Sequence, residues 1–428
     1  MLQTLKNAWR IEELRKKILF TLLILALYRL GNAIPVPYVN VAALQAYFTS
    51  LQNTVLGLLN VMSGGAFSQA TIFALSIQPY INASIIIQLL CIAIPALERM
   101  SKDEGEEGKK KIASITRYST VAIGLLQGFG FYMLIKNYGI LTDAAKGNVW
   151  AAIVIVLTFT SGSALIMWLG EQITEFGIGN GISMILFASI ISRFPTMIFT
   201  SITNIVRGEL DWWVFVFMLL GAIAIIVLIV FVNDAERRVP VVYAKRVVGR
   251  KMYGGQSTFL PMKVNMSGVM PIIFAQSIAS VPATIAAFTG KTDGWVNTWF
   301  GTNSIPYAIV YLLLIIFFAY FYSTIQFNPV EVSNNLKKNG GYIPGFRPGK
   351  PTSDFIQKVL NKITLFGAIY LGIIAVVPIL IAHFSTQSAL TGISLGGTSI
   401  IIVVGVALET IRALEAQMLM RNYKGFLD

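Results

Sequence analysis

The stretch LLNVMSGGAFSQATIFALSIQPYINASIIIQLLCIAIP, residues 58–95, sets the organisation of the chain. Its first part is short and rich in small residues, and its second part, from Thr71 to Ile94, is an apolar run broken by Pro79. About 20 helical residues cross the bilayer core, so the second part is long enough to form a spanning helix. Non-helical backbone at membrane depth is tolerated only inside protein or beside water. We therefore expect residues 58–70 to be a half-inserted segment tucked into the protein ahead of that helix.

The composition is that of a polytopic membrane protein, because 55% of the 428 residues are hydrophobic and only 12% are charged. Ten apolar runs of spanning length predict an all-α fold of ten transmembrane helices, near 18–34, 72–94, 114–135, 150–170, 181–201, 211–232, 267–288, 306–327, 363–383 and 397–413.

The N-terminal segment has basic residues ahead of an apolar run, which is the arrangement of a secretory signal peptide. The run continues to Ile34 without a cleavage site of the A-x-A type. We therefore expect an uncleaved first span.

Lys and Arg residues set the expected orientation. Loops on one side carry 27 of the 33 basic residues, the other side carries five, and Arg29 lies inside a span. Both termini are therefore expected in the cytoplasm. Two long loops on the same side, 233–266 and 328–362, hold 13 of the 27. Orientation alone would explain much of this charge.

Five spans per half would give halves of opposite topology, 1–208 and 209–428, an arrangement known for membrane pathways. Prolines fall at corresponding places in the second and seventh spans, where Pro79 matches Pro271 and Pro282. Helix-breaking prolines at matching positions indicate a functional site, although ordinary kinks would give the same pattern.

Catalytic motifs are missing from the sequence. Gly290-Lys291-Thr292 lacks the glycine of a phosphate-binding loop, since Ile285 stands there, and no HExxH motif occurs. The single Cys91 and the single His383 predict no metal site. We therefore expect no enzyme activity and no cofactor. Acidic residues sit at span ends or in loops, which argues against the main alternative, an ion-coupled solute transporter of inverted-repeat type.

Three motifs carry a resemblance that covers nearly the whole chain: ALSIQPYINAS (74–84), WLGEQITEFGIGNG (168–181) and PGFRPG (344–349). In order and spacing they are similar to the SecY family, the central subunits of the bacterial protein-conducting channel. The resemblance implies a central pore for unfolded secretory polypeptides, with lateral release of membrane-protein helices into the cytoplasmic membrane of a bacterium.

The resemblance assigns roles to three sets of residues. The ring that closes the pore would be Ile77, Ile81, Leu186, Ile190, Ile273 and Ile402. The plug under this ring would be Ser63, Gly64, Gly65, Ala66, Phe67, Ser68 and Gln69, although a re-entrant loop that only fills space would have the same composition. The polar seam of a lateral gate between the second and seventh helices would be Asn82, Gln88, Gln276, Ser277 and Ser280, where ordinary helix packing is the alternative.

The two basic loops are the expected docking surface, since the chain has no nucleotide site and translocation needs work from a partner. By resemblance the partners would be the ATPase SecA and the ribosome, with SecE and SecG as further subunits and signal sequences and nascent chains as substrates. The residues expected to dock are Arg246, Arg250, Lys251 and Arg347. Gly and Pro punctuate the second loop, which favours defined turns that would hold Arg347 on a rigid tip. A solvated basic loop is the alternative.

Overall fold

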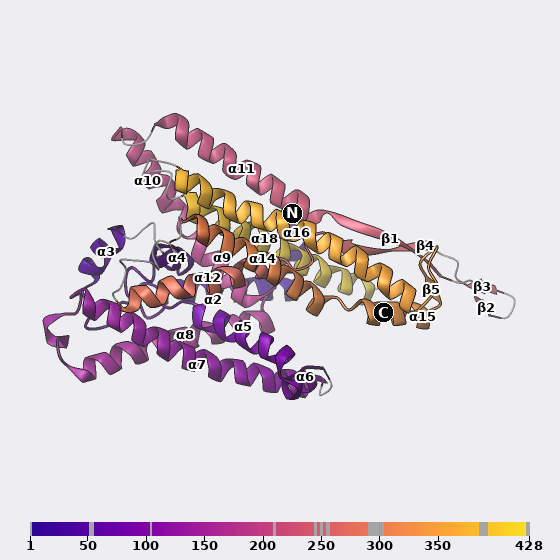
Figure 1. Cartoon of the computed structure of the whole chain (residues 1–428), viewed down its shortest axis with the longest axis horizontal. Coiled ribbons are helices and arrows are strands. Elements are labelled where there is room, and N and C mark those ends of the chain that lie inside the picture. Colours follow the sequence, from indigo (N-terminus) through magenta and orange to yellow (C-terminus); the bar gives the residue numbers. More distant parts are fainter. Residues whose placement is uncertain are drawn as a thin grey trace.

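A computed structural model describes the chain over residues 2–50, 55–102, 105–208, 211–243, 246–248, 251–253, 257–289, 299, 301, 304–384 and 393–424. Helices dominate it, and most run roughly parallel to one long axis (Figure 1).

The first half is helical throughout its described elements. These are α1 Leu2–Arg10, α2 Glu12–Gly31, α3 Val41–Ser50, α4 Val55–Met62, α5 Gln78–Ala93, α6 Pro95–Lys102, α7 Gly105–Asn137, the 3₁₀ turn η1 Asp143–Ala145, α8 Val149–Phe176, α9 Gly181–Ile191 and α10 Phe194–Val206.

The second half adds five short strands to its helices. Its elements are α11 Trp212–Asp234, β1 Glu236–Tyr243, β2 Arg246–Val248, β3 Lys251–Tyr253, β4 Ser257–Lys263, α12 Met270–Thr289, α14 Ile305–Gln326, α15 Pro329–Lys338, β5 Gly341–Tyr342, α16 Lys350–Phe384 and α18 Ile393–Lys424.

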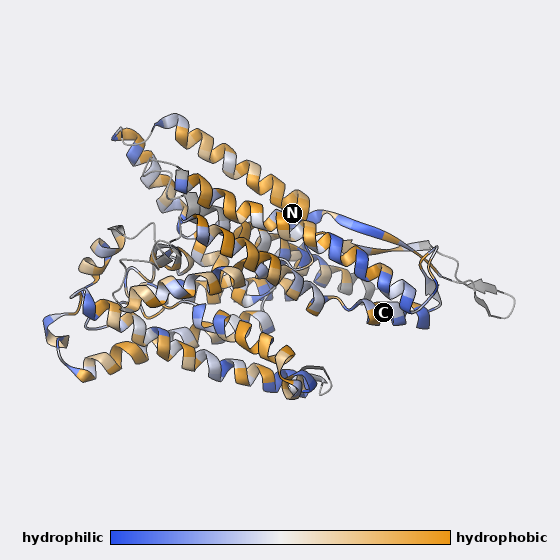
Figure 2. Ribbon diagram, in the orientation of Figure 1, coloured by the Kyte–Doolittle hydropathy of each residue, from blue (hydrophilic) through white to orange (hydrophobic). Residues whose placement is uncertain are grey.

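Each of the ten expected spans overlaps helix in the described residues, although two of them differ from the expectation in ways described below. Seven of these segments are long and apolar enough to cross a membrane, and α5 is a shorter apolar helix. Figure 2 shows apolar residues along the helices, while hydrophilic residues gather at the end of the molecule that carries β1, α15 and the start of α16. The protein is a mostly helical, multi-span membrane protein, as the sequence predicts.

The expected helix over 72–94 is wrong at its start, because α5 begins only at Gln78. The chain from Ser63 to Ile77 forms successive turns instead, with Ser76 at a positive φ of 51°. Pro79 is therefore the second residue of a helix, a position where its missing N–H is harmless, and not a break inside one. The non-helical backbone is buried inside the protein, which is the condition for such backbone at membrane depth.

The fifth span is also not one continuous helix. It is divided at Ser192 and Arg193 into α9 and α10, and Pro195 lies in the first turn of α10. Because proline lacks an N–H and its ring clashes with the preceding turn, a helix that begins anew at Phe194, with Pro195 in its first turn, avoids both costs.

The two long basic loops contain regular structure that the sequence analysis missed. In 233–266, β1 pairs antiparallel with β4, and β2 pairs with β3. β1 also pairs antiparallel with β5, which lies in the second loop, so this strand pair joins the two loops. Val239 and Val241 alternate with exposed residues along β1 and pack with Met262 against α15 and α16. In 328–362, α15 and the first turns of α16 replace most of the expected loop.

Two large apolar clusters form the core of the helical body. The first brings together residues from α2, α5, α8, α9, α12, α14, α16 and α18. The second lies among α3, α4, α7 and α8 and includes Phe67 of the expected plug. Residues 63–77 contribute side chains to both clusters, so this non-helical stretch is held between them.

Candidate functional site: a central aliphatic seal

All six residues expected in the ring lie in one buried cluster, and each has at most 3% of its surface exposed. Ile77 caps the start of α5, and Ile81 follows one turn later. Leu186 and Ile190 share one face of α9 by their i, i+4 spacing. Ile273 comes from α12 and Ile402 from α18, so four helices from both halves of the chain meet here.

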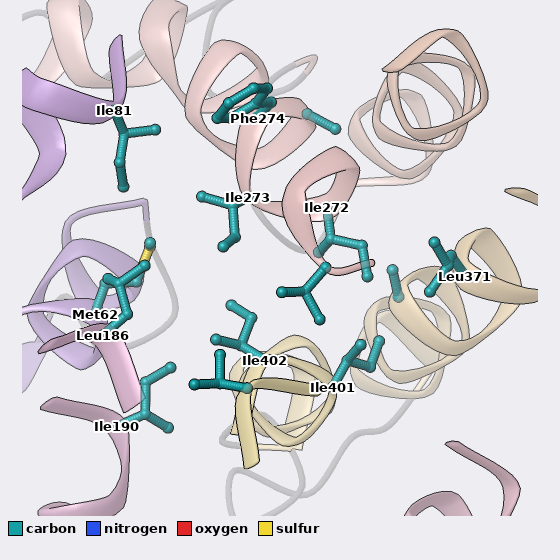
Figure 3. Packing of buried hydrophobic residues seen from close by; sticks show 14 of the residues in the cluster. Met62, Ile81, Leu186, Ile190, Ile272, Ile273, Phe274, Leu371, Ile401 and Ile402 are labelled. Carbon is teal, nitrogen blue, oxygen red and sulfur yellow. The ribbon is translucent and has the colours of Figure 1, made fainter. Parts of the chain in front are cut away.

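Figure 3 shows how this seal is built. Ile81, Leu186, Ile190, Ile273 and Ile402 point toward a common centre from their separate helices. The neighbouring Ile272 and Ile401 point away from that centre, toward Leu371. On both α12 and α18, one residue of an adjacent pair thus points to the common centre and the other packs within the second half.

Met62 lies in the same buried cluster as the six expected ring residues, and sequence reasoning missed it. It is the last residue of α4, is 3% exposed, and comes from a helix that contacts α9, which carries Leu186. Gln78, which was also missed, donates from Nε2 to the Met62 sulfur at 3.3 Å. A flexible thioether fills irregular gaps well, so Met62 suits the contact between a re-entrant segment and a ring of branched side chains.

The expected plug residues are packed against the protein. Ser63, Ala66 and Phe67 are buried, Gly64, Gly65 and Ser68 are half-buried, and Gln69 is exposed. The preceding helix α4 contacts α9, α12 and α18, three of the four helices that supply the ring. The helix that leads into the segment thus packs against the elements that supply the expected ring, and the plug role of residues 63–69 stays a prediction.

The five residues expected at the lateral gate divide between two seams. Gln276, Ser277 and Ser280 of α12 are buried, and Ser277 donates to Gln78 of α5 at 3.5 Å. Gln88 instead accepts a hydrogen bond from the Tyr322 hydroxyl of α14 at 3.0 Å. Asn82 is half-buried on α5. α5 is thus joined by polar contacts to α12 near its start and to α14 farther along.

The three described residues among those expected to dock partners lie in strands or between turns. Arg246 is in β2 and Lys251 in β3, and Arg250 lies outside the described residues. Arg347 is exposed between two turns, and its carbonyl accepts from Thr352 Oγ1 at 2.8 Å. The neighbouring Phe346 packs on Phe355 with ring centroids 4.2 Å apart, so the backbone that presents Arg347 is fixed.

Solved channels share this architecture. The solved structure of a protein-conducting channel matches with a TM-score of 0.66 and 16% identity, covering 94% of this chain and 92% of that chain. A second structure, described by the role of the SecY plug domain in stabilising the closed state, matches with a TM-score of 0.67 and 17% identity, over 94% and 92% of the two chains. The chain thus has the fold of the protein-conducting channels.

Sequence comparison assigns the chain to a family within this class of channels. The family model described as SecY matches residues 71–411. The chain is 45% identical over 443 residues to the protein translocase subunit SecY of Streptomyces scabiei, and 43% identical over 446 residues to that of Mycobacterium bovis, with all of each chain covered. This protein belongs to the SecY family.

Proposed function

We propose that this chain is the passive pore through which unfolded secretory polypeptides cross the cytoplasmic membrane and from which membrane-protein helices leave sideways into lipid. The observation that carries the proposal is the seal, in which six buried aliphatic side chains from four helices converge, with the re-entrant segment beside them. The proposal also agrees with the names of the relatives, which are protein translocase subunits.

The seal has the chemistry that a polypeptide channel needs at rest. A narrow apolar neck expels water and so stops ions, even without a charged filter. Aliphatic side chains carry no hydrogen-bonding groups that would select among passing residues. Because Ile81 and Ile190 come from the first half while Ile273 and Ile402 come from the second, separating the halves would open the neck.

Conductance of the idle channel in planar bilayers tests the seal. Ile273→Asn or Ile402→Asn would wet the neck, so each should raise the ion leak and the tolerance of defective signal sequences. Val281→Asn is the matched control on α12, because Val281 is 41% exposed on the outside of the body. Ring variants that leak no more than the control would remove the basis for the pore assignment.

Lateral release would use the boundary of α5 with α12 and α14. The polar contacts there are few and individually weak, since interhelical hydrogen bonds in membranes average about 0.6 kcal/mol. An apolar signal helix that packs well against both sides could therefore replace them. Gln88 and Ser277, which bridge to different neighbours, are the gate residues that this proposal emphasises.

A partner motor would dock at the hydrophilic end. We propose SecA and the ribosome for this role, with SecE and SecG as further subunits, in a bacterial membrane with both termini of the chain in the cytoplasm. Arg347, exposed on a fixed turn, suits bidentate recognition of carboxylate or phosphate. Ribosome-bound channels occur among the proteins of this fold, such as Sec61 in a canine ribosome–channel complex, with a TM-score of 0.63, 15% identity, and 94% and 92% of the two chains covered.

Charge reversal tests the docking. Arg347→Glu should block SecA-driven translocation while the amount of channel in the membrane stays normal, and Lys350→Glu, three residues on, should be milder. Small and equal effects would mean that the turn is only a charged face. Labelling of cysteines placed at Lys109 and Arg250 checks the orientation separately, since both should react only from the cytoplasmic side.

A further inference from the structure

A polar network ties the re-entrant segment to the first half of the chain, and no part of the seal uses it. Asn60 of α4 is its centre. Its carbonyl accepts from the backbone N–H of Gly65 at 2.8 Å and from Ser63 Oγ at 3.1 Å, and its side-chain Oδ1 accepts from the N–H of Ser68 at 3.0 Å. Asn60 is 8% exposed, so these bonds form in a site largely closed to water. They fix the shape of the segment itself.

Arg193 attaches this centre to the helical body. It stands at the break between α9 and α10, and its Nη1 donates to the carbonyl of Asn60 at 3.2 Å. That carbonyl lies in the last turn of α4, where the helix end carries a partial negative charge that favours a cation. A guanidinium is suited to such a position because it supplies both the donor and the positive charge.

Tyr28 and Ser189 form a second attachment between the segment and the helices, at the carbonyl of Ser63. Both are fully buried, at 0% exposure, and the Tyr28 hydroxyl lies 2.7 Å from Ser189 Oγ. The same hydroxyl lies 3.4 Å from the carbonyl oxygen of Ser63, so it bridges α2, α9 and the segment. The Tyr28 ring stacks on Phe73 at 5.7 Å, which holds the hydroxyl in place.

We propose that Tyr28, Ser189 and Arg193 form a polar latch that holds the plug shut against the first half of the channel. The proposal rests on the proposed function, because it requires the segment to be a plug. All three residues lie on α2, α9 or the turn after α9, so movement of the second half alone leaves the latch closed. Opening the pore then takes two events, separation of the ring and release of the latch. Polar contacts suit the second event because water can replace them once the plug has moved.

Accessibility of the plug in the assembled channel tests the latch. The reporter is Ala66→Cys, buried at 2% exposure, in a Cys91→Ala background, and the readout is the rate of its modification by a charged, membrane-impermeant thiol reagent added from the outer side. Arg193→Gln should raise this rate about 10-fold, since it removes a charge-assisted bond, and Tyr28→Phe about 3-fold, since it removes a neutral one. Arg193→Lys, which keeps the charge, should restore part of the protection.

Matched controls separate the latch from general loosening. Arg207→Gln changes an exposed arginine at the end of α10, and Tyr320→Phe removes a hydroxyl that bonds to the carbonyl of Asn361, far from the plug. Both should label at the unmodified channel's rate, and thermal unfolding of all variants should agree within a few degrees. Labelling of Arg193→Gln at the control rate would overturn the latch. If Ile402→Asn still raises the ion leak in that case, the pore function stands without the latch. If Arg193→Gln labels at the control rate and Ile402→Asn raises no leak, both the latch and the pore function are wrong.

Discussion

The ring of Phe67 stacks on the ring of Phe131, with centroids 4.1 Å apart and an interplanar angle of 19°. Phe67 belongs to the re-entrant segment and Phe131 to α7, so this pair joins the segment to the second apolar cluster. Phe48 of α3 meets the other side of Phe67 edge-on, at 5.3 Å. Aromatic packing thus joins the segment to the second apolar cluster, while Phe73 and Ile77 of the same non-helical stretch belong to the first.

Removing this packing should release the segment. Truncating a buried Phe costs about 3–5 kcal/mol, so Phe67→Ala should raise the resting conductance of the channel in planar bilayers well above that of the unmodified chain. Phe67→Leu, which keeps most of the volume but loses the stack, should be intermediate. Phe129→Ala on the exposed face of α7 serves as the control, and a leak of equal size there would contradict the assignment.

Gly64 and Gly65 offer a matched pair of substitutions. Both have positive φ, at 69° and 92°, so alanine at either costs about 1–2 kcal/mol in backbone strain. Only at Gly64 would a Cβ crowd a neighbour, the carbonyl oxygen of Ser189 at 3.0 Å, while the space around Gly65 is open within 4 Å. Gly64→Ala should therefore leak more than Gly65→Ala in the same conductance measurement. Equal leaks would show that backbone strain alone accounts for the effect.

Tyr322→Phe should loosen the seam between α5 and α14, because it removes the hydrogen bond to Gln88. With an average of about 0.6 kcal/mol per interhelical bond, we expect roughly a threefold gain in export of a precursor with a defective signal sequence. Tyr320→Phe on the same helix removes a hydroxyl that bonds within the second half and should leave export unchanged. A larger gain with Tyr320→Phe would count against a gate at Gln88.

Lys263 of β4 makes the stability of the sheet depend on pH. Partial desolvation of the ammonium, and then the nearby charge of Arg412, lower the pKa of Lys263 below its ordinary value of 10.5, although the residue as a whole is exposed. Between the lowered pKa and 10.5 the unfolded chain binds more protons than the folded one, so stability rises with pH across that window. Below the lowered pKa, the charged ammonium of Lys263 destabilises the folded state.

Lys263→Met should therefore raise the unfolding temperature at pH 8, and the rise in unfolding temperature should be smaller at pH 10.5. Lys358→Met, at an exposed position of α16, is the control and should change little at either pH. An equal gain at both pH values would point to added apolar contact as the cause, and no gain at pH 8 would contradict the direction of the shift.

The sequence by itself determined the class of fold. Ten apolar runs and the concentration of Lys and Arg in alternate loops are consequences of the bilayer, which imposes length and low charge on any span. The family motifs extended this to particular residues. The six residues assigned to the ring are scattered from Ile77 to Ile402, and single isoleucines in membrane helices carry no signal of their own. Their role in closing the pore stays a prediction.

Only the tertiary structure decided where helices begin and which residues contact the segment 63–69. The hydropathy pattern gives the length of an apolar run, but it does not distinguish buried turns from helix. It therefore could not show that α5 starts at Gln78, or that the basic loops contain strands. The contacts of Arg193 with Asn60, and of Tyr28 with Ser189, join residues 133 and 161 positions apart. Hydrogen bonds of this kind depend on distances between helices, which local sequence patterns do not encode and which packing alone fixes.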